Sequence, residues 1–493
     1  MRFEAVLLEA VAEEAKNHLL GWFRQGQRQE DLCFALWRPS TGASRTTGIV
    51  TELLLPLDGE RNLHGNVSFE PHYLGRVARR ACQSGMGVAF MHSHPIPGWQ
   101  PMSRADVIAE RDRIAAPSRA AGLPLLGLTV GNDGAWSARF WSWDGREYSR
   151  TDCDKVRVVG RGMQVTANPH RAPPLLRSTR LRRTLDTWGP ERQATLASLR
   201  VGVVGLGSVG SIIAEALARI GATDLLLVDA DRVEEHNLDR LLYATENDIG
   251  RFKVDMIADR LRSSASAASF RVDPRRAWVQ ERDAYASVLD CDILFAAVDR
   301  PLPKDLLNNI AYVHCIPVVF GGVRVATKSD GHLADATWSV VRAGPESRCL
   351  RCDGQYTTSA VMMERDGSLD DPTYVAQGPA APGNENVFPF SANLGSLMVL
   401  EMLRAVLREP WWPTVPSKLH YSYVSARMMS QIADCHSGCS VAARTAHGDL
   451  WTYPFIDEPM VRDTRPKGYR DRLAALLHYP WLSGIRTWIG KRT

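Results

Sequence analysis

Residues 199–231 of the 493-residue chain read LRVGVVGLGSVGSIIAEALARIGATDLLLVDAD. The apolar run 199–206 predicts a buried strand, the turn after it carries Gly205, Gly207 and Gly210, and the residues that follow have helical spacing. Glycines at such places permit a tight turn, let the backbone approach a phosphate and bring the helix close to the strand. The N-terminus of the helix favours an anion. This stretch therefore predicts a strand–turn–helix unit that binds a nucleotide.

The residues beyond this turn indicate which nucleotide it binds. The second strand ends in Asp229, near the offset of about 20 residues expected of an acid that binds a ribose, and Asp231 follows it. The glycine pattern alone would equally fit a nicotinamide-dependent oxidoreductase. Asn237, Arg240 and Lys253 come next, and a triphosphate needs such groups because Arg and Lys hold its phosphates and the leaving pyrophosphate. We therefore expect ATP, and the two cations argue against NAD.

A further buried run, CDILFAAVDR (291–300), ends in Asp299. A carboxylate at the C-terminal end of a parallel strand lies where ligands bind in such sheets, so Asp299 is a candidate to hold Mg²⁺. Strand and helix patterns alternate from Leu199 to about residue 440. This alternation predicts an α/β domain with a Rossmann-like, doubly wound and mostly parallel sheet.

In order and spacing, these motifs resemble the ThiF/MoeB/ubiquitin-activating superfamily of adenylyltransferases over residues 177 to 440. Arg177-Ser178-Thr179-Arg180 resembles the opening element of that family, and Gln193 resembles the glutamine that follows it. The resemblance implies that Arg180 reaches the ATP of the opposite protomer, and hence a homodimer. It also implies attack by the C-terminal carboxylate of a small protein on the α-phosphate, which gives an acyl adenylate and pyrophosphate.

The same resemblance implies a role for each polar residue of the nucleotide site. The acid that ends the second strand would bind the ribose, the amide and the two cations would bind phosphates, and the last acid would position Mg²⁺. In that order the residues are Asp229, Asn237, Arg240, Lys253 and Asp299.

Four of the nine cysteines form two close pairs, Cys349-x-x-Cys352 and Cys435-x-x-x-Cys439. Four thiolates that converge would make a closed, structural zinc site. Three residues separate the second pair where two are usual, so His436 is a competing ligand, and four free buried thiols are the alternative. Many proteins of the ThiF type carry such a paired knuckle at these places.

No cysteine lies between Cys352 and Cys435, where ubiquitin-activating enzymes carry their thioester nucleophile. Cys315 falls in a predicted buried strand and is expected to be inert. The reaction then stops at the adenylate and the acyl group passes to a separate protein, or a hydroxyl within residues 357–359 accepts it. The first account is the simpler one.

A second candidate site lies near the N-terminus, where His92 and His94 project from the same face of a predicted strand. Asp106 follows twelve residues after His94, in a predicted helix that begins at Ser103. Two imidazoles and one carboxylate make a catalytic zinc set with one position left open. A glutamate ahead of the first strand would supply the general base.

This pattern resembles the JAMM/MPN zinc metallo-isopeptidases over nearly all of residues 1–150. The resemblance implies that His92, His94 and Asp106 bind Zn²⁺, that Ser103 helps to stabilise the oxyanion, and that Glu30 is the base. Asp31 is an alternative base in a shifted register. Two features depart from the family pattern, namely the eight residues between His94 and Ser103 and the presence of Cys33 where a glycine is usual. The plainer interpretation is a capped helix start beside two solvated histidines.

Four segments are predicted along the chain. Residues 1–155 form the JAB/MPN-like domain, 156–195 a Pro- and Arg-rich linker that leads into the adenylation domain, 196–440 the adenylation domain, and 441–493 a C-terminal extension. Residues 1–20 have the pattern of an amphipathic helix. Within the first segment the other expected strands are 32–37, 48–56, 87–94, 123–131 and 136–145, and the expected helices are 71–82 and 103–116.

Composition narrows the class of protein. A net charge of +4 without a concentrated basic stripe does not indicate a nucleic-acid partner, and no apolar run approaches the length of about 20 residues that spans a membrane. Nine cysteines are too few for a disulfide scaffold in so long a chain. We expect a cytoplasmic protein.

Together the two sites predict a bifunctional enzyme of a bacterial ubiquitin-like system. One domain would adenylate the flexible C-terminal tail of a ubiquitin-like protein, and the other would process or deconjugate that protein, with a downstream conjugating protein as a possible further partner. The alternatives are a sulfur-carrier protein adenylyltransferase of cofactor biosynthesis, and a scaffold in which one domain is inactive.

Overall fold

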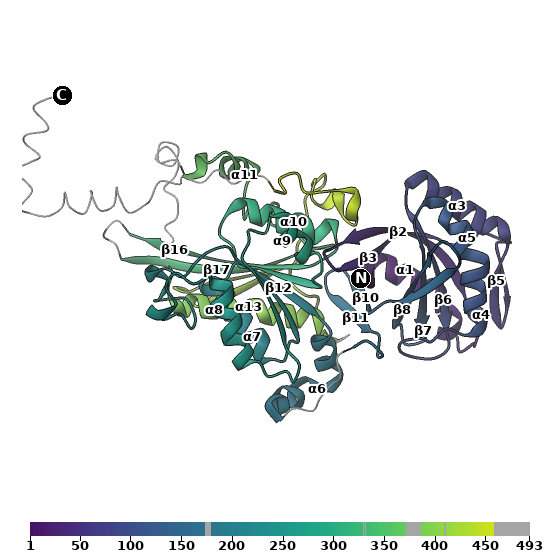
Figure 1. The fold of residues 1–493 in the computed structure, drawn as a ribbon, viewed down its shortest axis with the longest axis horizontal. Helices are drawn as coiled ribbons and strands as arrows, with labels where there is room; N and C mark the ends of the chain where they lie inside the picture. The colour runs from purple at the N-terminus through teal and green to yellow at the C-terminus, as the bar shows by residue number, and fades with distance from the viewer. Residues whose placement is uncertain (173–178, 329, 331, 371–385, 409–410, 458–493) are drawn as a thin grey trace, which may run out of the picture. The chain divides into compact units, whose positions relative to one another are not determined.

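The computed structural model describes residues 1–172, 179–328, 330, 332–370, 386–408 and 411–457. The chain divides into two compact units, Met1–Thr357 with Pro382–Glu458, and Thr358–Ala381 with Pro459–Thr493. In the second unit the described elements are α11 (Thr358–Arg365) and η6 (Ser368–Asp370). The first unit holds two large sheets (Figure 1), and we call the parts built on them the N-terminal lobe (1–172) and the C-terminal lobe (179–357 and 386–457).

The N-terminal lobe is built on a nine-stranded sheet of order β11-β10-β1-β3-β2-β6-β7-β8-β9. Its strands are β1 (Arg2–Leu8), β2 (Leu32–Thr41), β3 (Arg45–Leu54), β6 (Gly87–His94), β7 (Leu125–Gly131), β8 (Trp136–Trp143), β9 (Tyr148–Asp152), β10 (Lys155–Val159) and β11 (Met163–Ala167). β4 (Arg61–His64) and β5 (Asn66–Phe69) form a separate pair. The helices are α1 (Glu9–Leu19), α2 (Gly21–Arg24), α3 (Pro71–Ser84), α4 (Arg104–Ile108), the π-helix η1 (Ala109–Ile114), α5 (Ala115–Ser118) and η2 (Arg119–Ala121).

Both faces of this sheet are buried, because side chains alternate along each strand. On one face Cys33, Ala35 and Trp37 of β2 share a core with α1. On the other face the intervening residues of β2 pack against α3 and α5. The strand β6, which carries His92 and His94, therefore lies inside a well-packed sheet beside β2 and β7.

Two expectations for this lobe are wrong. Residues 1–20 are not one helix, because Arg2–Leu8 form the strand β1 in parallel between β3 and β10, and only the following residues are helical. Residues 156–167, the first part of the predicted linker 156–195, are not a linker, because β10 pairs with β1 and β11 closes the edge. In both cases a partner far away in sequence overrides the local pattern, so the sheet extends past the expected boundary at residue 155.

The C-terminal lobe contains an eight-stranded sheet of order β14-β13-β12-β15-β16-β17-β18-β19. Its strands are β12 (Arg200–Val204), β13 (Asp224–Val228), β14 (Arg271–Arg275), β15 (Ile293–Ala296), β16 (Val318–Thr327), β17 (Leu333–Ala343), β18 (Lys418–Ser422) and β19 (Arg427–Gln431). The helices are η3 (Thr179–Leu181), α6 (Arg182–Ala197), α7 (Ser208–Arg219), η4 (Glu235–Asn237), η5 (Glu246–Asp248), α8 (Lys253–Ser264), α9 (Arg282–Val288), α10 (Pro301–Val313), α13 (Phe388–Val406), η7 (Ala442–Arg444) and η8 (Gly448–Leu450).

The expected Rossmann-like α/β architecture is confirmed, although half of the sheet differs from the expectation. The strands from β14 to β16 are parallel, with α7, α8 and α13 on one face and α9 and α10 on the other (Figure 1). The strands from β16 to β19 are antiparallel, so the sheet is mixed. The chain order reverses between β12 and β15, and such a switch point is where ligands bind at the carboxyl ends of the strands.

The two lobes share a buried core and a buried charge cluster. Val6, Ile49 and Val159 of the N-terminal lobe pack in one hydrophobic cluster with Val201 and Leu199 of the C-terminal lobe. The charge cluster surrounds an aspartate of the C-terminal lobe and comprises Glu4, Arg45, Lys155, Arg157 and Asp292, all almost fully buried. The lobes are thus joined by both apolar and ionic contacts.

Among the described residues, no helix is long and apolar enough to cross a bilayer.

Candidate active sites

A cavity of about 860 Å³ opens at the switch point of the C-terminal sheet. Most of the residues expected to bind the nucleotide line it. They are Gly205, Gly207, Asp229, Asp231, Asn237, Arg240, Lys253 and Asp299. The turn after β12 and the acid after β15 therefore meet across the crevice, as the parallel arrangement of those strands requires.

Two glycines of the turn, Gly205 and Gly210, have a steric reason to be glycine. Gly205 has φ of +87°, which a residue with a side chain rarely adopts. A Cβ on Gly210 would lie 1.8 Å from the carbonyl oxygen of Gly205, so only glycine lets α7 approach the turn this closely. Gly207 precedes the first residue of α7, whose N-terminus therefore faces the cavity. An anion bound there would meet free backbone N–H groups.

Asp229 ties the turn to the next strand. Its two carboxylate oxygens accept the backbone N–H groups of Leu206 at 2.6 Å and Asp231 at 2.7 Å. Burial raises the pKa of this carboxyl. Each oxygen keeps a second lone pair, so the side chain can still accept a hydrogen bond from a ligand hydroxyl.

The cations and the amide of the pocket all have polar neighbours. Lys253 begins α8, and its Nζ lies 3.1 Å from Asp231 Oδ2. Arg240 NH1 lies 2.8 Å from Asp239 Oδ1. Asn237 Oδ1 accepts the backbone N–H of Glu234 at 3.1 Å. These residues are held by local contacts at the mouth of the cavity, and bound phosphates would compete with the acids for the cations.

The structure does not bring all of the expected residues to this cavity. Arg180 is exposed in η3 and does not line it, and Arg177 lies outside the described residues. Gln193 is buried and donates through Nε2 to the carbonyl oxygen of Ile220 at 3.1 Å, which fixes α6 against the end of α7. Within its own chain Gln193 therefore has a structural role.

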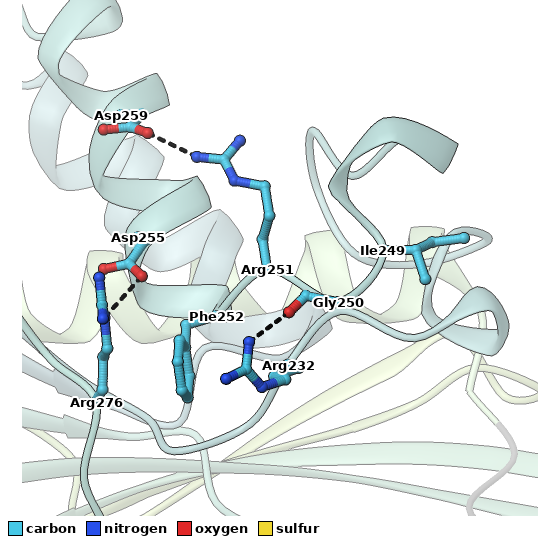
Figure 2. Close-up of a pocket in the computed structure, with 8 residues that line it drawn as sticks. All are labelled: Arg232, Ile249, Gly250, Arg251, Phe252, Asp255, Asp259 and Arg276. Carbon is cyan, nitrogen blue, oxygen red and sulfur yellow. Dashed lines mark hydrogen bonds and ion pairs between the residues drawn. The ribbon is translucent and has the colours of Figure 1, made fainter.

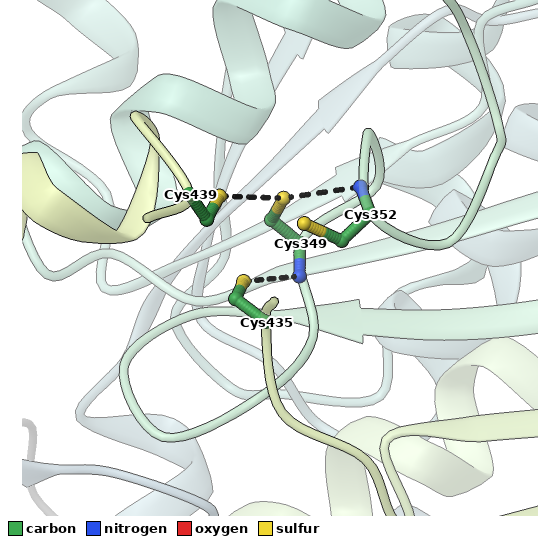
Figure 3. Close-up of side chains that lie close together, drawn as sticks. All are labelled: Cys349, Cys352, Cys435 and Cys439. Carbon is green, nitrogen blue, oxygen red and sulfur yellow. Dashed lines mark hydrogen bonds between the residues drawn. The ribbon is translucent and has the colours of Figure 1, made fainter. Parts of the chain in front are cut away.

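The two cysteine pairs converge although more than 80 residues separate them (Figure 3). All four Sγ atoms lie within 4.8 Å of one another, and those of Cys349 and Cys439 are 3.7 Å apart. Thiolates bound at about 2.3 Å to a tetrahedral zinc stand about 3.8 Å apart, so the donor set fits this ion. Although burial opposes the shift, the backbone N–H of Ala442 helps to lower the pKa of Cys439 to about 6. His436 is not part of this cluster.

The remaining expectations about cysteine and hydroxyl nucleophiles concern Cys315 and residues 357–359. Cys315 is fully buried, and burial raises the pKa of its thiol to about 12, which makes it a poor nucleophile. Thr358 and Ser359 begin α11 in the second unit.

In the N-terminal lobe His92, His94 and Asp106 also converge. The two imidazole Nε2 atoms are 3.1 Å apart, and Asp106 lies 3.6 Å from the first and 3.4 Å from the second. Nitrogen and oxygen ligands at about 2.1 Å from a tetrahedral zinc stand about 3.4 Å apart, so these three side chains fit a zinc ion. Burial lowers the pKa of His92, which favours the neutral, ligating form.

Helix capping holds Asp106 in place. Ser103 Oγ accepts the backbone N–H of Asp106 at 3.1 Å, and Asp106 Oδ2 accepts the backbone N–H of Ser103 at 2.7 Å. The expected helix start is therefore a capping box, and the same carboxylate faces both histidines. The structural and the metal-binding interpretations of these residues are compatible.

The two candidate bases, Glu30 and Asp31, have different surroundings. Asp31 is nearly fully buried, and its carboxylate is paired with Arg61 and lies 3.5 Å from His18 Nε2. Glu30 is half-buried, and its charge interacts with His94 and Asp106. Burial raises the pKa of Glu30.

The sequence profile of the ThiF family matches residues 179–441, more than half of the chain. The chain belongs to the ThiF family. The match includes the nucleotide cavity and the cysteine cluster, and it begins after the His92–His94–Asp106 cluster.

Three known proteins illustrate the similarity. The SAMP-activating enzyme E1 of Haloferax volcanii is 33% identical over 166 residues, which cover 34% of this chain and 58% of the relative. The adenylyltransferase and sulfurtransferase uba4 of Aspergillus fumigatus is 26% identical over 283 residues, 54% of this chain and 53% of the relative. The chain thus spans about half of the length of these relatives. The crystal structure of E. coli MccB with ATP aligns with a TM-score of 0.41 and 18% identity, over 55% of this chain and 76% of that one.

The ThiF-family lobe also places residues in the cavity that sequence reasoning missed. Lys304 of α10, Arg324 of β16, and Lys418 and His420 of β18 add positive or titratable groups to its lining. Lys418 Nζ pairs with Asp353 Oδ2 at 2.9 Å, and Asp353 directly follows Cys352 of the cysteine cluster. The position of Asp353 directly after Cys352 is the sequence feature that points to this part of the cavity. If the cysteine cluster packs on the sheet, the residues next to its cysteines lie there as well.

A second cavity, of about 850 Å³, flanks the start of α8 (Figure 2). There the Phe252 ring lies against the Arg232 guanidinium, 3.8 Å from it, and the Arg276 guanidinium, 5.0 Å from it. Arg276 is also paired with Asp255 at 2.8 Å. Phe252 immediately precedes Lys253, so these contacts hold the end of α8 that presents Lys253 to the nucleotide cavity.

Proposed function

We propose that the ThiF-family lobe adenylates the C-terminal carboxylate of a ubiquitin-like or sulfur-carrier protein with ATP. The observation that carries this proposal is the single cavity at the switch point, where the glycine turn, Asp229, Lys253 and Asp299 meet. A nicotinamide oxidoreductase has no need of the cations, and membership of the ThiF family supports the adenylation.

The residues of the cavity fit the groups of ATP and Mg²⁺. The backbone N–H groups at the N-terminus of α7 would hold a phosphate, and Asp229 would accept a hydrogen bond from a ribose hydroxyl. Lys253 and Arg240 would bind the phosphates and stabilise the charge that develops as pyrophosphate leaves. Asp299 would hold Mg²⁺, which when bound neutralises phosphate charge.

The kind of carrier is a finer proposal. The relative from Aspergillus is named an adenylyltransferase and a sulfurtransferase, which favours a sulfur carrier. The relative from Haloferax is named an activating enzyme for SAMP. A sulfur-carrier protein is therefore preferred over a ubiquitin-like protein that is conjugated to targets. Arg180, which is outside the cavity of its own chain, would complete the site of a second protomer in a homodimer.

ATP–pyrophosphate exchange tests this function. We expect the full chain to exchange labelled pyrophosphate into ATP only when a small carrier protein with a free C-terminal Gly-Gly is present. The same carrier shortened by two residues should give no exchange, because the attacking carboxylate no longer reaches the α-phosphate. Exchange that does not depend on a carrier, or no exchange with any cognate carrier, would contradict the proposal, and the latter result would support a scaffold. A thiocarboxylated product would indicate a sulfur carrier, and a conjugate on a target a ubiquitin-like one.

A second function is favoured by the convergence of His92, His94 and Asp106. The N-terminal lobe would be a zinc peptidase of the JAMM type that cleaves after the carrier's C-terminus. Zinc, when bound, polarises a carbonyl and lowers the pKa of water. Glu30 would accept the proton of the attacking water and deliver it to the leaving amine, and Ser103 would help to stabilise the oxyanion.

Replacement of Glu30 by glutamine tests this second function. We expect Glu30→Gln to lower the cleavage of a carrier with a C-terminal extension by about 10²–10⁴-fold, the usual contribution of a general base, with zinc still bound. Cleavage is followed by mass spectrometry and zinc content by metal analysis. The exposed Glu14→Gln on α1 is the matched control and should cleave normally. Equal rates for the two variants would exclude Glu30 as the base.

A further inference from the structure

We propose that Glu110 and Arg139 form a positioning pair that sets the zinc affinity of the His92–His94–Asp106 cluster. The pair connects the helix that carries the aspartate to the strands beneath the histidines. This inference rests on the metal site proposed above. It concerns two residues that touch neither the cluster's ligand atoms nor the expected position of the substrate.

The helical side of the connection is Glu110. It lies four residues after Asp106, in the π-helix η1 that continues α4, and it is fully buried. Its carboxylate accepts two hydrogen bonds from Arg139, one of them from Nε at 2.9 Å, and a third from Trp141 Nε1 at 2.7 Å. Both donors belong to β8. The segment that presents Asp106 is thereby bound to the sheet by three buried hydrogen bonds.

The strand side of the connection leads to His92. Arg139 NH1 donates to Thr129 Oγ1 at 2.5 Å, and this hydroxyl lies 3.4 Å from His92 Nε2. Thr129 of β7 is the register partner of His92 on β6. A continuous series of polar contacts therefore runs from the helix, through Arg139, to the first histidine of the cluster.

A glycine supplies an independent observation. Gly127 lies in the fully buried strand β7, where glycine weakens a strand and usually marks a close approach of another group. A Cβ at this position would lie 2.4 Å from Glu110 Oε2 and 2.6 Å from Arg139 Nε. Because Gly127 has no side chain, the Glu110–Arg139 ion pair can occupy the space above this position.

The cluster needs such a connection because its ligands come from separate elements. The histidines are fixed by the sheet, but Asp106 comes from α4, which is five residues long and has no fully buried residue. Zinc tolerates ligand distances within about 0.2 Å of their ideal values. Loss of residues that orient metal ligands typically costs about 10–100-fold in metal affinity.

Zinc titration of the full chain against a chromogenic chelator tests the inference. The wild type should bind two zinc ions, and a His92→Ala/His94→Ala variant should bind one, at the cysteine cluster. In Glu110→Gln we expect the affinity of the His92–His94–Asp106 site to fall by about 10–100-fold, and that of the cysteine site to stay unchanged. If the wild type binds zinc at the cysteine site alone, the proposed metal site and this inference both fail.

A double variant separates positioning from stability. Glu110→Leu/Arg139→Met removes both buried charges together, so the midpoint temperature of thermal unfolding should be close to that of the wild type. Zinc affinity should stay low, because the helix is no longer held in register by directed hydrogen bonds. Wild-type zinc affinity in this variant, or in a stably folded Glu110→Gln, would overturn the inference while leaving the metal site itself intact.

Discussion

Replacement of Lys253 by alanine is expected to lower carrier-dependent ATP–pyrophosphate exchange by about 10²–10³-fold, as the loss of one preorganised donor to a developing charge typically does. Lys253 is the first residue of α8, it lines the cavity, and only 11% of its side chain is exposed. Asp231, whose carboxylate pairs with Lys253, also lines the cavity. Bound phosphates would therefore compete with Asp231 for the Lys253 ammonium. Initial exchange rates at saturating carrier measure the effect.

Lys328→Ala is the matched control for this variant. Lys328 is exposed after the end of β16 and does not line the cavity, so its exchange rate should equal that of the wild type. The midpoint temperature of thermal unfolding of Lys253→Ala should stay close to that of the wild type. The Asp231 partner is 45% exposed, and partly exposed ion pairs contribute little to stability. An exchange rate within a few-fold of the control would show that Lys253 does not bind the transferred phosphates.

Replacement of Asp292 by alanine is expected to lower the free energy of unfolding by about 3–5 kcal/mol, the cost of removing one partner of a buried ion pair. Its carboxylate lies 2.6 Å from both Arg45 NH1 and Lys155 Nζ, and 3.3 Å from Arg157 Nε. All of these groups are buried, and without Asp292 the three cations would keep Glu4 as their one ion-pair partner among the described residues. Urea unfolding followed by fluorescence measures the loss.

Asp259→Ala serves as the control, because Asp259 also pairs with an arginine, at 2.7 Å, but is 55% exposed on α8. A change below about 1 kcal/mol is expected there. Should the two variants lose similar stability, the charge cluster between the lobes would not stabilise their association. In that case the shared apolar core around Val6 and Val201 would account for it.

Much of the C-terminal lobe was predictable because its signals are local. The glycine turn, the acid that ends the next strand and the cations that follow occupy one continuous stretch of sequence. In any Rossmann-like fold, the element order β12–α7–β13 places these residues close together. Sequence reasoning missed the antiparallel half of the sheet and the residues that it adds to the cavity, such as Lys418 and His420. Nothing near these residues in sequence indicates which strand they pair with.

Three features follow from patterns that are local in the sequence: the glycines of the nucleotide turn, the helix capped at Ser103, and the alternation that puts His92 and His94 on one face of a strand. Other features depend on contacts between segments that are distant in the sequence. Such contacts make residues 2–8 an internal strand, bring the two cysteine pairs together and pair Asp31 with Arg61. Local patterns reflect backbone preference over a few residues, whereas strand pairing, burial and ligand convergence depend on which distant segments exclude water from one another.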